Sequence, residues 1–431
     1  MHRVLAPRRP TSRVRGVSLT SLGLSAPLLR AAADQGYQEP TPIQAAVIPE
    51  VLAGRDVWAK ASTGTGKTAA FVLPILQMLG PLAVPRRVAA LILVPTRELA
   101  KQTLDVIAAL RAHLPQRPKA VVVLGGVSIN PQMMELRGGA DIVVATPGRL
   151  LDLVDQNAVS LGSVRQLVLD EADRLMDNNF GDELARIVEL LPTTRQTLLF
   201  SATFSPALKQ IEKRLMRAPV RIEVAEPATE VPSITQRAIE VDASRRTQLL
   251  RHLLETEQWE RVLVFVATTH ATDHVSAKLR AAGINAIALS GQMSQGARTK
   301  ALDMFRASRV HVLVATDLAS RGLDIAGLPA VVNYDLPRSP TDYVHRIGRT
   351  GRAGETGVAV SFLTAEAAAH FAIIEKTHKH RVARERIAGF EPTQAPIAPP
   401  STGGVKGARM SKKDKLRASG RLPPRGDAPD D

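Results

Sequence analysis

A short run rich in glycine and threonine, residues 61–68, has the composition of a loop that binds phosphate. It follows an apolar stretch, Val57–Ala59, and precedes a helix-like stretch, Ala69–Leu79. A strand, a glycine-rich turn and a helix in this order direct backbone N–H groups and the positive end of the helix at an anion. A lysine in such a loop reaches the outer phosphates of a nucleotide, and a hydroxyl ligates Mg²⁺. The residues expected to bind a nucleoside triphosphate are Thr63, Gly64, Thr65, Gly66, Lys67 and Thr68.

Three acidic residues in a run of four follow another apolar stretch, Gln166–Leu169. Carboxylates at the C-terminal end of a parallel strand lie at the crevice where such sheets bind ligands. We expect Asp170 to hold Mg²⁺ together with Thr68, partly through water, and Glu171 to orient and deprotonate an attacking water. The N-terminus of a helix with favourable acidic charges would also explain this run by itself. The phosphate loop earlier in the same domain favours the catalytic interpretation.

Strand-like and helix-like runs alternate along most of the chain. The strand-like runs are short and aliphatic, and glycine, proline, threonine or aspartate bounds them, which predicts βαβ units and a parallel sheet. The expected strands are Val88–Val94, Ala120–Leu124, Asp141–Ala145, Gln166–Leu169, Thr197–Phe200, Val262–Val266, Ala286–Leu289, Val310–Ala315, Ala330–Asn333 and Val358–Phe362. The expected helices are Arg97–Leu114, Thr269–Ala282, Gln295–Ala307 and Thr341–Arg346.

The alternation breaks once in the middle of the chain, where residues 224–234 contain two prolines and no periodicity. The fold class is therefore α/β, with two domains in tandem, each a mainly parallel sheet flanked by helices. We expect the first domain at residues 18–223 and the second at 235–376. A basic arm, residues 1–17, precedes them. Residues 377–431 have few large apolar side chains near their end, which predicts a disordered basic tail.

The formal net charge is +15, and the excess cations lie at the two ends of the chain. Residues 1–15 carry five arginines and no acid, and residues 376–431 carry thirteen lysines and arginines against six acids. Basic ends favour a polyanion because they release its counterions. A role in solubility alone would also explain them.

The chain has no cysteine, which excludes disulfides, thiolate metal sites and thiol catalysis. No apolar run approaches the ~20 residues that a membrane-spanning helix needs. The N-terminal arginines are not followed by the apolar core of a secretory signal. We therefore expect a cytoplasmic protein with no membrane association.

In order along the chain, these and further motifs resemble those of the DEAD-box RNA helicases of helicase superfamily 2. The resemblance covers roughly residues 18–365 and rests on about ten motifs, each at a strand end or in a loop. It implies two tandem RecA-like domains that close around ATP, Mg²⁺ and a strand of RNA. It also implies an ATP-dependent RNA helicase, in which RNA-stimulated ATP hydrolysis drives local, non-processive unwinding or remodelling of RNA–protein complexes.

The resemblance assigns further residues to the nucleotide. In the segment 36–44, Gln44 would read the adenine edge and Tyr37 would pack near the base. The aromatic residue that stacks on adenine in many members corresponds here to Leu19, which implies weaker stacking. Asp324 would face the ribose hydroxyls. The run 345–352 carries three arginines spaced by three, and Arg349 and Arg352 would act as arginine fingers on the γ-phosphate.

Two more sets follow from the resemblance. The RNA-binding set would contact the sugar and phosphate backbone without reading bases: Pro95, Thr96, Arg97, Gly126, Thr146, Pro147, Gly148, Arg149, Arg298 and Thr316. The set that couples ATP and RNA comprises Asp173, Ser201, Thr203 and His345, with His345 bonding across to the acidic loop.

The segments 22–25 and 294–298 are most similar to bacterial RhlE-like members, and ribosomal or RNA-decay assemblies are candidate partners. Two other functions stay open. A DNA-directed ATPase would use the same scaffold, although the segment 36–44 and the intact acidic run argue against it. A non-unwinding RNA clamp would retain the same catalytic residues.

Overall fold

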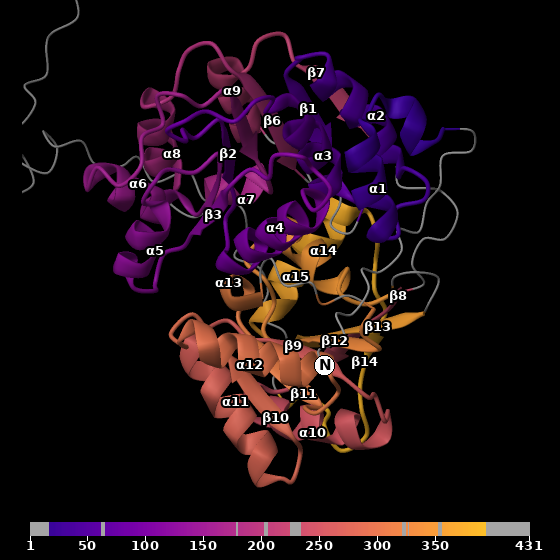
Figure 1. The fold of residues 1–431 in the computed structure, drawn as a ribbon. Helices are drawn as coiled ribbons and strands as arrows, with labels where there is room; N and C mark the ends of the chain where they lie inside the picture. The colour runs from indigo at the N-terminus through magenta and orange to yellow at the C-terminus, as the bar shows by residue number, and fades with distance from the viewer. Residues whose placement is uncertain are drawn as a thin grey trace, which may run out of the picture.

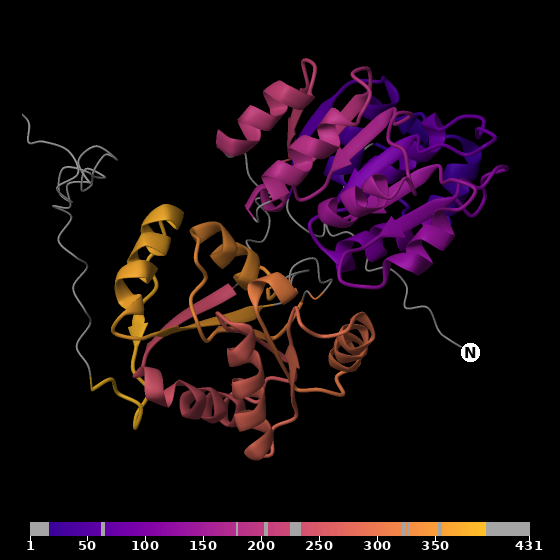
Figure 2. The same cartoon turned by 90° about the vertical axis from the view of Figure 1, so that its left-hand side faces the viewer.

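The computed structural model of the protein describes residues 17–61, 65–177, 180–201, 206–224, 234–320, 325, 327–351 and 356–393. These residues form two parallel sheets of seven strands each, and Figures 1 and 2 show the sheets and their helices as two lobes. The predicted fold class, two α/β domains in tandem, is confirmed.

The first domain has the strand order β3-β4-β2-β5-β6-β1-β7, and every neighbouring pair is parallel. Its strands are β1 Val57–Lys60, β2 Ala90–Leu93, β3 Ala120–Val123, β4 Ile142–Ala145, β5 Gln166–Leu169, β6 Gln196–Ser201 and β7 Val220–Glu223. Its helices are η1 Leu19–Leu22, α1 Ala26–Asp34, α2 Pro42–Leu52, α3 Lys67–Met78, α4 Arg97–Leu110, α5 Ile129–Leu136, α6 Pro147–Asp155, α7 Ala172–Asp177, α8 Phe180–Glu189 and α9 Pro206–Leu215. The phosphate loop lies between β1 and α3, and the acidic run follows β5, two strands away.

The second domain repeats this plan with the order β10-β11-β9-β12-β13-β8-β14. Its strands are β8 Ile234–Glu240, β9 Val262–Phe265, β10 Ala286–Leu289, β11 Val312–Ala315, β12 Ala330–Asn333, β13 Gly357–Leu363 and β14 Arg384–Glu385. Its helices are η2 Ala243–Arg245, α10 Arg246–Thr256, α11 Thr269–Ala281, α12 Gln295–Arg306, α13 Asp317–Ser320, α14 Pro340–Ile347 and α15 Ala367–His378. In Figure 1, α13 and α14 lie on the side of this domain that faces the first one.

Each sheet is covered on both faces, so its strands alternate between two cores. In β9, Val262 and Val264 pack into one cluster while Leu263 and Phe265 pack into the other. In β2 the same alternation divides four aliphatic residues between the two cores of the first domain. Strands buried on both faces read as continuous aliphatic runs, which is why the central strands were visible in the sequence.

The predicted tail, residues 377–431, is wrong in its first part. Helix α15 continues to His378, and β14 pairs with β8 at the edge of the second sheet. Beyond β14, Thr393 donates from its backbone N and its Oγ1 to the carboxylate of Asp242, at 3.0 and 2.8 Å. This segment is held by polar contacts and has no periodic apolar pattern. Its ordered structure could therefore not be predicted from the sequence. We call residues 380–393 the C-terminal strap.

In the part of the chain that the structure describes, every helix is too short or too polar to span a lipid bilayer.

Candidate active site

Glycine is required where the phosphate loop enters helix α3. Gly66 immediately precedes the helix with a φ of +93°, a conformation that residues with a side chain rarely adopt. A Cβ atom at this position would lie 2.6 Å from Nε2 of Gln44 and 3.0 Å from Oγ1 of Thr41. The N-terminal amides of α3, which have no partners within the helix, are thereby brought against the segment around Gln44.

Gln44 is buried, and its amide supports the phosphate loop. Its Nε2 donates to the carbonyl of Gly66 at 3.2 Å, and its Oε1 accepts from the backbone N of Thr41 at 3.0 Å. Thr41 completes a capping box at the start of α2. An adenine contact by Gln44 would use the remaining donor and acceptor capacity of the same amide, so that role stays a prediction.

The two positions assigned to the neighbourhood of the base, Tyr37 and Leu19, both lie against the core of the first domain. Tyr37 is half-buried against the core of the first domain, and burial raises the pKa of its hydroxyl. Leu19 is buried in that core, with 5% of its surface exposed. Leu19 therefore packs inside the domain and offers no surface for stacking on a base.

Lys67 and Asp170 form the charged centre of the first domain's site. Both side chains are buried, and Nζ of Lys67 lies 4.0 Å from Oδ1 of Asp170. Burial raises the pKa of Asp170 to about 6, although the Lys67 charge opposes the rise. A buried carboxylate with a raised pKa has lost solvation that a cation could restore. A raised pKa of this origin is expected of a carboxylate that can bind a metal ion.

The pKa of Glu171 is shifted in the opposite direction to that of its neighbour Asp170. Burial alone would raise the pKa of Glu171, but nearby positive charge, chiefly that of Arg174, holds it below its usual value. Nη1 of Arg174 lies 3.0 Å from Oε2 of Glu171, and both side chains are buried. The backbone of Glu171 has a φ of 50°, which is uncommon for a residue with a side chain. The sequence assignments omitted Arg174, although it stands next to the acidic run.

Asp173 ends the acidic run with one oxygen unsatisfied. Its Oδ1 accepts from the backbone N of Arg174 at 3.2 Å. Its Oδ2 is buried and has no hydrogen-bond partner within the described residues. Ser201, its expected coupling partner, ends β6 in a buried position, and its backbone carbonyl accepts from the backbone N of Ala61 at 3.0 Å.

Helix α14 of the second domain approaches this cluster. The imidazole of His345 is largely buried, and its pKa falls to about 3 because of burial first and the Arg174 charge second. His345 is therefore neutral at physiological pH. Its Nδ1 is buried and, within the described residues, has no hydrogen-bond partner. The positive charge of the buried Arg349 acts on Glu171 and lowers its pKa. The predicted approach of the arginine segment to the acidic loop is thus present, without the hydrogen bond expected of His345.

The loops after β2, β3 and β4 are joined into one edge of the first domain. Nη1 of Arg97 donates to the carbonyl of Gly126 at 3.5 Å, and a Cβ atom at Gly126 would overlap the Arg97 guanidinium. The backbone N of Gly125 donates to Oγ1 of Thr146 at 3.2 Å. Arg149 donates to the carbonyl of Val127 at 2.9 Å. Most of the predicted RNA-binding residues of this domain therefore lie together.

The other residues of that edge occupy strand ends and helix starts. Thr96 caps α4 by accepting from the backbone N of Leu99 at 3.2 Å. Pro95 and Pro147 are buried, and Gly148 has no room for a large side chain because Glu183 lies close to it.

Arg298 lies in the second domain but makes its shortest contact with the first. Its Nη2 lies 2.6 Å from Oε1 of Glu98 on α4, and both side chains are buried. The remaining guanidinium N–H groups donate to the carbonyls of Ser290 and Ala319, each at 3.0 Å. The guanidinium predicted to bind RNA is thus occupied, and it joins the two domains. The pairing of Glu98 with Arg298 was not predicted from the sequence, because the two residues lie two hundred positions apart.

Other predicted site residues are placed less completely. Oγ1 of Thr316 accepts from the backbone N of Ala319 at 3.3 Å and caps the short helix α13. Thr65 and Thr68 flank Lys67 and are partly exposed. Five of the predicted residues lie outside the described part of the chain: Thr63, Gly64, Thr203, Asp324 and Arg352.

A parallel sheet with a glycine-rich loop after β1, acids after β5 and cations from a second sheet define a two-domain P-loop ATPase. Residues 41–211 match the DEAD/DEAH box helicase domain, and residues 245–354 match the helicase conserved C-terminal domain. The chain belongs to the DEAD-box helicase family.

Curated relatives agree with this assignment. The chain is 42% identical to the ATP-dependent rRNA helicase rrp3 of Emericella nidulans, over 80% of its length and 74% of the relative's. It is 38% identical to the DEAD-box ATP-dependent RNA helicase CshA of Bacillus subtilis, over 88% of its length and 75% of the relative's.

Solved structures agree on the fold, which is a pair of RecA-like domains. S. cerevisiae Dbp5 bound to RNA and ADP BeF3 gives a TM-score of 0.75 at 31% identity, covering 88% of this chain and 96% of that one. A Dbp5 variant bound to Gle1 and IP6 gives 0.66 with the same coverage.

Proposed function

We propose that this chain is an ATP-dependent RNA helicase in which RNA stimulates ATP hydrolysis and hydrolysis drives local, non-processive duplex unwinding or remodelling of RNA–protein complexes. One observation carries the proposal. Lys67, Asp170 and Glu171 of the first domain share a buried cluster with Arg349 of the second. An ATPase whose site is completed only when two domains meet can be controlled by a ligand that brings them together.

Each residue of the cluster suits one part of phosphoryl transfer. Lys67 and the amides at the start of α3 would hold the phosphates. Glu171 has a lowered pKa, so it is ionised at neutral pH and can accept a proton from the attacking water. Arg349, with Arg352 as a second finger, would stabilise the negative charge that develops on the transferred phosphoryl group.

We propose Mg²⁺ as the metal that accompanies ATP. Within the described residues no group of three or more His, Cys, Asp or Glu side chains forms a closed metal site. The buried Asp170 and the hydroxyl of Thr68 nevertheless suit an ion that keeps several waters and binds substrate phosphates. When bound, the ion would neutralise charge on the phosphates, and Asp170 would orient it directly or through water.

RNA would lie along the joined loops of the first domain and continue onto the second near Thr316. Helix starts, glycine amides and arginines contact phosphates and sugars without reading bases. The 2′-hydroxyl would distinguish RNA from DNA along such a surface. The buried Arg298 is better suited to holding the two halves of this surface in line, through Glu98, than to touching a phosphate itself.

ATP turnover measured with no nucleic acid, with single-stranded RNA and with DNA of the same sequence tests the proposal. We expect RNA to stimulate hydrolysis at least tenfold more than DNA does. Lys67→Ala should abolish turnover, and the exposed Lys213→Ala should leave it unchanged. Equal stimulation by DNA would favour the DNA-directed ATPase. Stimulated hydrolysis without release of a short RNA duplex would favour the clamp.

We also propose the finer assignments drawn from the sequence. These are membership of the bacterial RhlE-like group, a cytoplasmic location, and work in ribosomal or RNA-decay assemblies. Residues 394–431 carry eight lysines and arginines against four acids, which supports a role in RNA affinity. Their removal should weaken RNA binding and flatten its salt dependence, with basal ATPase retained. An unchanged salt slope would contradict the role of the tail.

A further inference from the structure

We propose that Arg346 is a positioning residue that ties the RNA-facing loops of the second domain to helix α14, and thereby lets bound RNA set the position of Arg349. The proposal rests on the function proposed above. Arg346 is the first arginine of the run 345–352, and neither ATP nor RNA contact accounts for it. It lies one residue from His345 and three from Arg349, so contacts that fix its side chain also restrain the segment that completes the ATP site.

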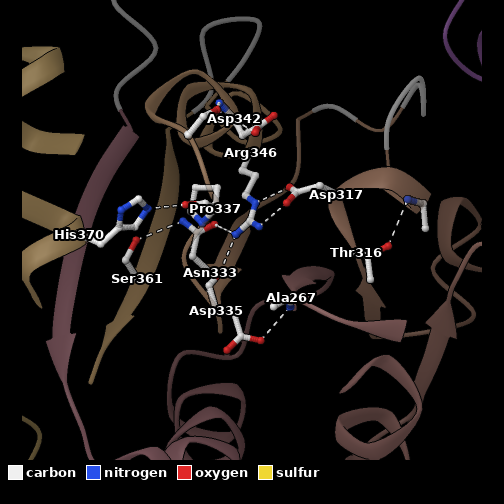
Figure 3. Close-up of polar contacts among 12 residues, drawn as sticks. Ala267, Thr316, Asp317, Asn333, Asp335, Pro337, Asp342, Arg346, Ser361 and His370 are labelled. Atoms are coloured by element: carbon white, nitrogen blue, oxygen red, sulfur yellow. Dashed lines mark hydrogen bonds and ion pairs between the residues drawn. The ribbon is translucent and has the colours of Figure 1, made fainter. Parts of the chain in front are cut away.

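The guanidinium of Arg346 is buried and bound on several sides (Figure 3). Its Nε and Nη2 lie 2.6 and 2.7 Å from the two carboxylate oxygens of Asp317, a two-pronged ion pair. Its Nη1 donates to Oδ1 of Asn333 at 3.1 Å and to the carbonyl of Asp335 at 2.6 Å. Its Cζ also lies 4.7 Å from the ring centre of Phe265.

These partners come from the ends of three adjacent strands. Phe265 ends β9, Asn333 ends β12, and Asp317 lies just beyond the end of β11. The strands are neighbours in the order β11-β9-β12. A side chain that only filled the core would contact apolar groups on a strand or helix face. Arg346 instead fastens the carboxyl edge of the sheet to α14 by directed, charge-assisted bonds, which resist small displacements.

The same edge carries the loops proposed to face RNA. Asp317 is covalently next to Thr316. Asp335 extends the network to a second loop, because its Oδ2 accepts from the backbone N of Ala267 at 2.8 Å, just before the N-terminus of α11. Asp335 also pairs with Arg246 of α10. Figure 3 shows this chain of contacts running from Ala267 and Asp317 to Arg346.

A phosphate bound at Thr316 would therefore press on the carboxylate that holds Arg346. When the loop that carries Thr316 and Asp317 is in place, Arg346 holds α14 in the position that presents Arg349 to the ATP site. When this loop is displaced, α14 is less restrained. Coupling of this kind is reciprocal for binding free energies, so RNA must raise the affinity for ATP, and ATP the affinity for RNA, by the same factor through the same contacts.

The test compares Asp317→Asn with the wild type. The variant keeps the shape of the side chain but loses the charge that grips Arg346. We expect basal ATPase without RNA to stay within twofold of the wild type. Stimulation by a saturating single-stranded RNA oligonucleotide should fall about tenfold, and the gain in RNA affinity on adding a non-hydrolysable ATP analogue should fall by a similar factor. Asp317→Glu, which restores the charge, should recover part of both.

A matched control is Glu375→Gln, which removes a two-pronged pair with Arg384 elsewhere in the same domain. It should leave RNA stimulation unchanged. If Asp317→Asn lowers basal and stimulated turnover by the same factor, or leaves both unchanged, the proposal is overturned. Arg346→Lys gives a second test. This variant should lose more of the RNA-stimulated ATPase activity than of the basal activity. A wild type that RNA does not stimulate would overturn the proposed function itself, which distinguishes that failure from failure of the coupling.

Discussion

Asp170 and Glu171 are adjacent and buried, yet their surroundings move their pKa values in opposite directions. Burial raises the pKa of Asp170 to about 6, while nearby cations hold that of Glu171 below its usual value. The difference suits two roles. In the proposed mechanism a metal ion would restore the solvation that Asp170 has lost, and the ionised Glu171 would accept a proton.

Asp170→Asn should make the ligand-free protein more stable at alkaline pH while abolishing ATPase. The folded state binds a proton at Asp170 more tightly than the unfolded state, so the proton's stabilisation is complete below pH ~4 and is lost as pH rises through about 6. Above that range the wild type carries a cost of roughly 1–3 kcal/mol, at 1.36 kcal/mol per pKa unit. Urea unfolding of the first domain at pH 8 and pH 4 measures the difference.

The gain from Asp170→Asn should be present at pH 8 and should disappear at pH 4. The exposed Asp105→Asn provides the control and should change stability by less than about 0.5 kcal/mol at either pH. A variant that is less stable than the wild type at pH 8 would show that Asp170 is stabilised by Lys67 more than it is penalised by burial.

Arg174→Gln should move the acidic limb of the ATPase pH profile to higher pH. Arg174 supplies the strongest of the charges that lower the pKa of Glu171, so its loss lets burial raise that pKa. We expect kcat at pH 6.5 to fall about tenfold more than kcat at pH 8.5, with the KM for ATP within twofold. Arg174→Lys should recover most of the profile. A fall in kcat that is uniform across pH would indicate a role in folding rather than in the charge state of Glu171.

At the scale of secondary structure, the sequence predicted aliphatic strands better than polar or very short ones. Gln166–Leu169, Ala286–Leu289 and Ala330–Asn333 were predicted with their observed bounds, because each is largely an unbroken aliphatic run. The strands β7, β8 and β14 were not predicted. β7 is partly exposed, β8 mixes polar and apolar residues, and β14 has only two residues.

Many residues of the site were predicted, but the contacts between its motifs were not. Residues in loops that follow central strands, such as Lys67, Asp170 and Thr146, were predicted because local spacing defines each motif. Contacts between motifs were not predicted, because they depend on how the chain folds back on itself. Arg346 with Asp317 and Arg298 with Glu98 join segments far apart in sequence, and no local pattern marks either pair.

The C-terminal strap should stabilise the second domain. Its Glu385 receives both Nε and Nη2 of Arg237, at 2.8 and 2.5 Å, and these bonds hold β14 against β8. Its Phe390 packs beside His252 of α10. We expect a chain that ends at Lys379 to lose at least about 2 kcal/mol of stability in this domain, because Arg237 and Glu240 of β8 each lose a charged partner. Thermal unfolding would measure the loss.

A chain that ends at Thr393 is the matched control for the strap, since it keeps every strap contact and lacks only the residues beyond. Its unfolding temperature should equal that of the full chain. Equal unfolding temperatures for the two truncated chains would mean that the strap lies on the surface of the domain without stabilising it.

At the scale of the whole molecule, a buried ion pair between Arg298 and Glu98 links the two domains at the edge proposed to bind RNA. Arg298 and Glu98 lose solvation only when the domains are together, and in that arrangement each is the other's charged partner. Their pairing therefore contributes to the closed arrangement and to no other.

Glu98→Gln should favour the open arrangement, because closing the domains would then bury the Arg298 guanidinium without a countercharge, a situation that costs several kcal/mol in buried pairs. Part of this cost is avoided if the domains stay apart and Arg298 stays hydrated. We expect the RNA concentration for half-maximal ATPase to rise about tenfold, equivalent to about 1.4 kcal/mol, with ATP binding to the first domain unchanged. Energy transfer between a dye on each domain should report fewer closed molecules at equal ligand concentration.

Adding Arg298→Gln to Glu98→Gln should recover part of the closure, because the uncompensated charge is gone. If the double variant closes no better than Glu98→Gln alone, burial of the Arg298 charge does not oppose closure, and the pair is a consequence of domain contact rather than one of its causes.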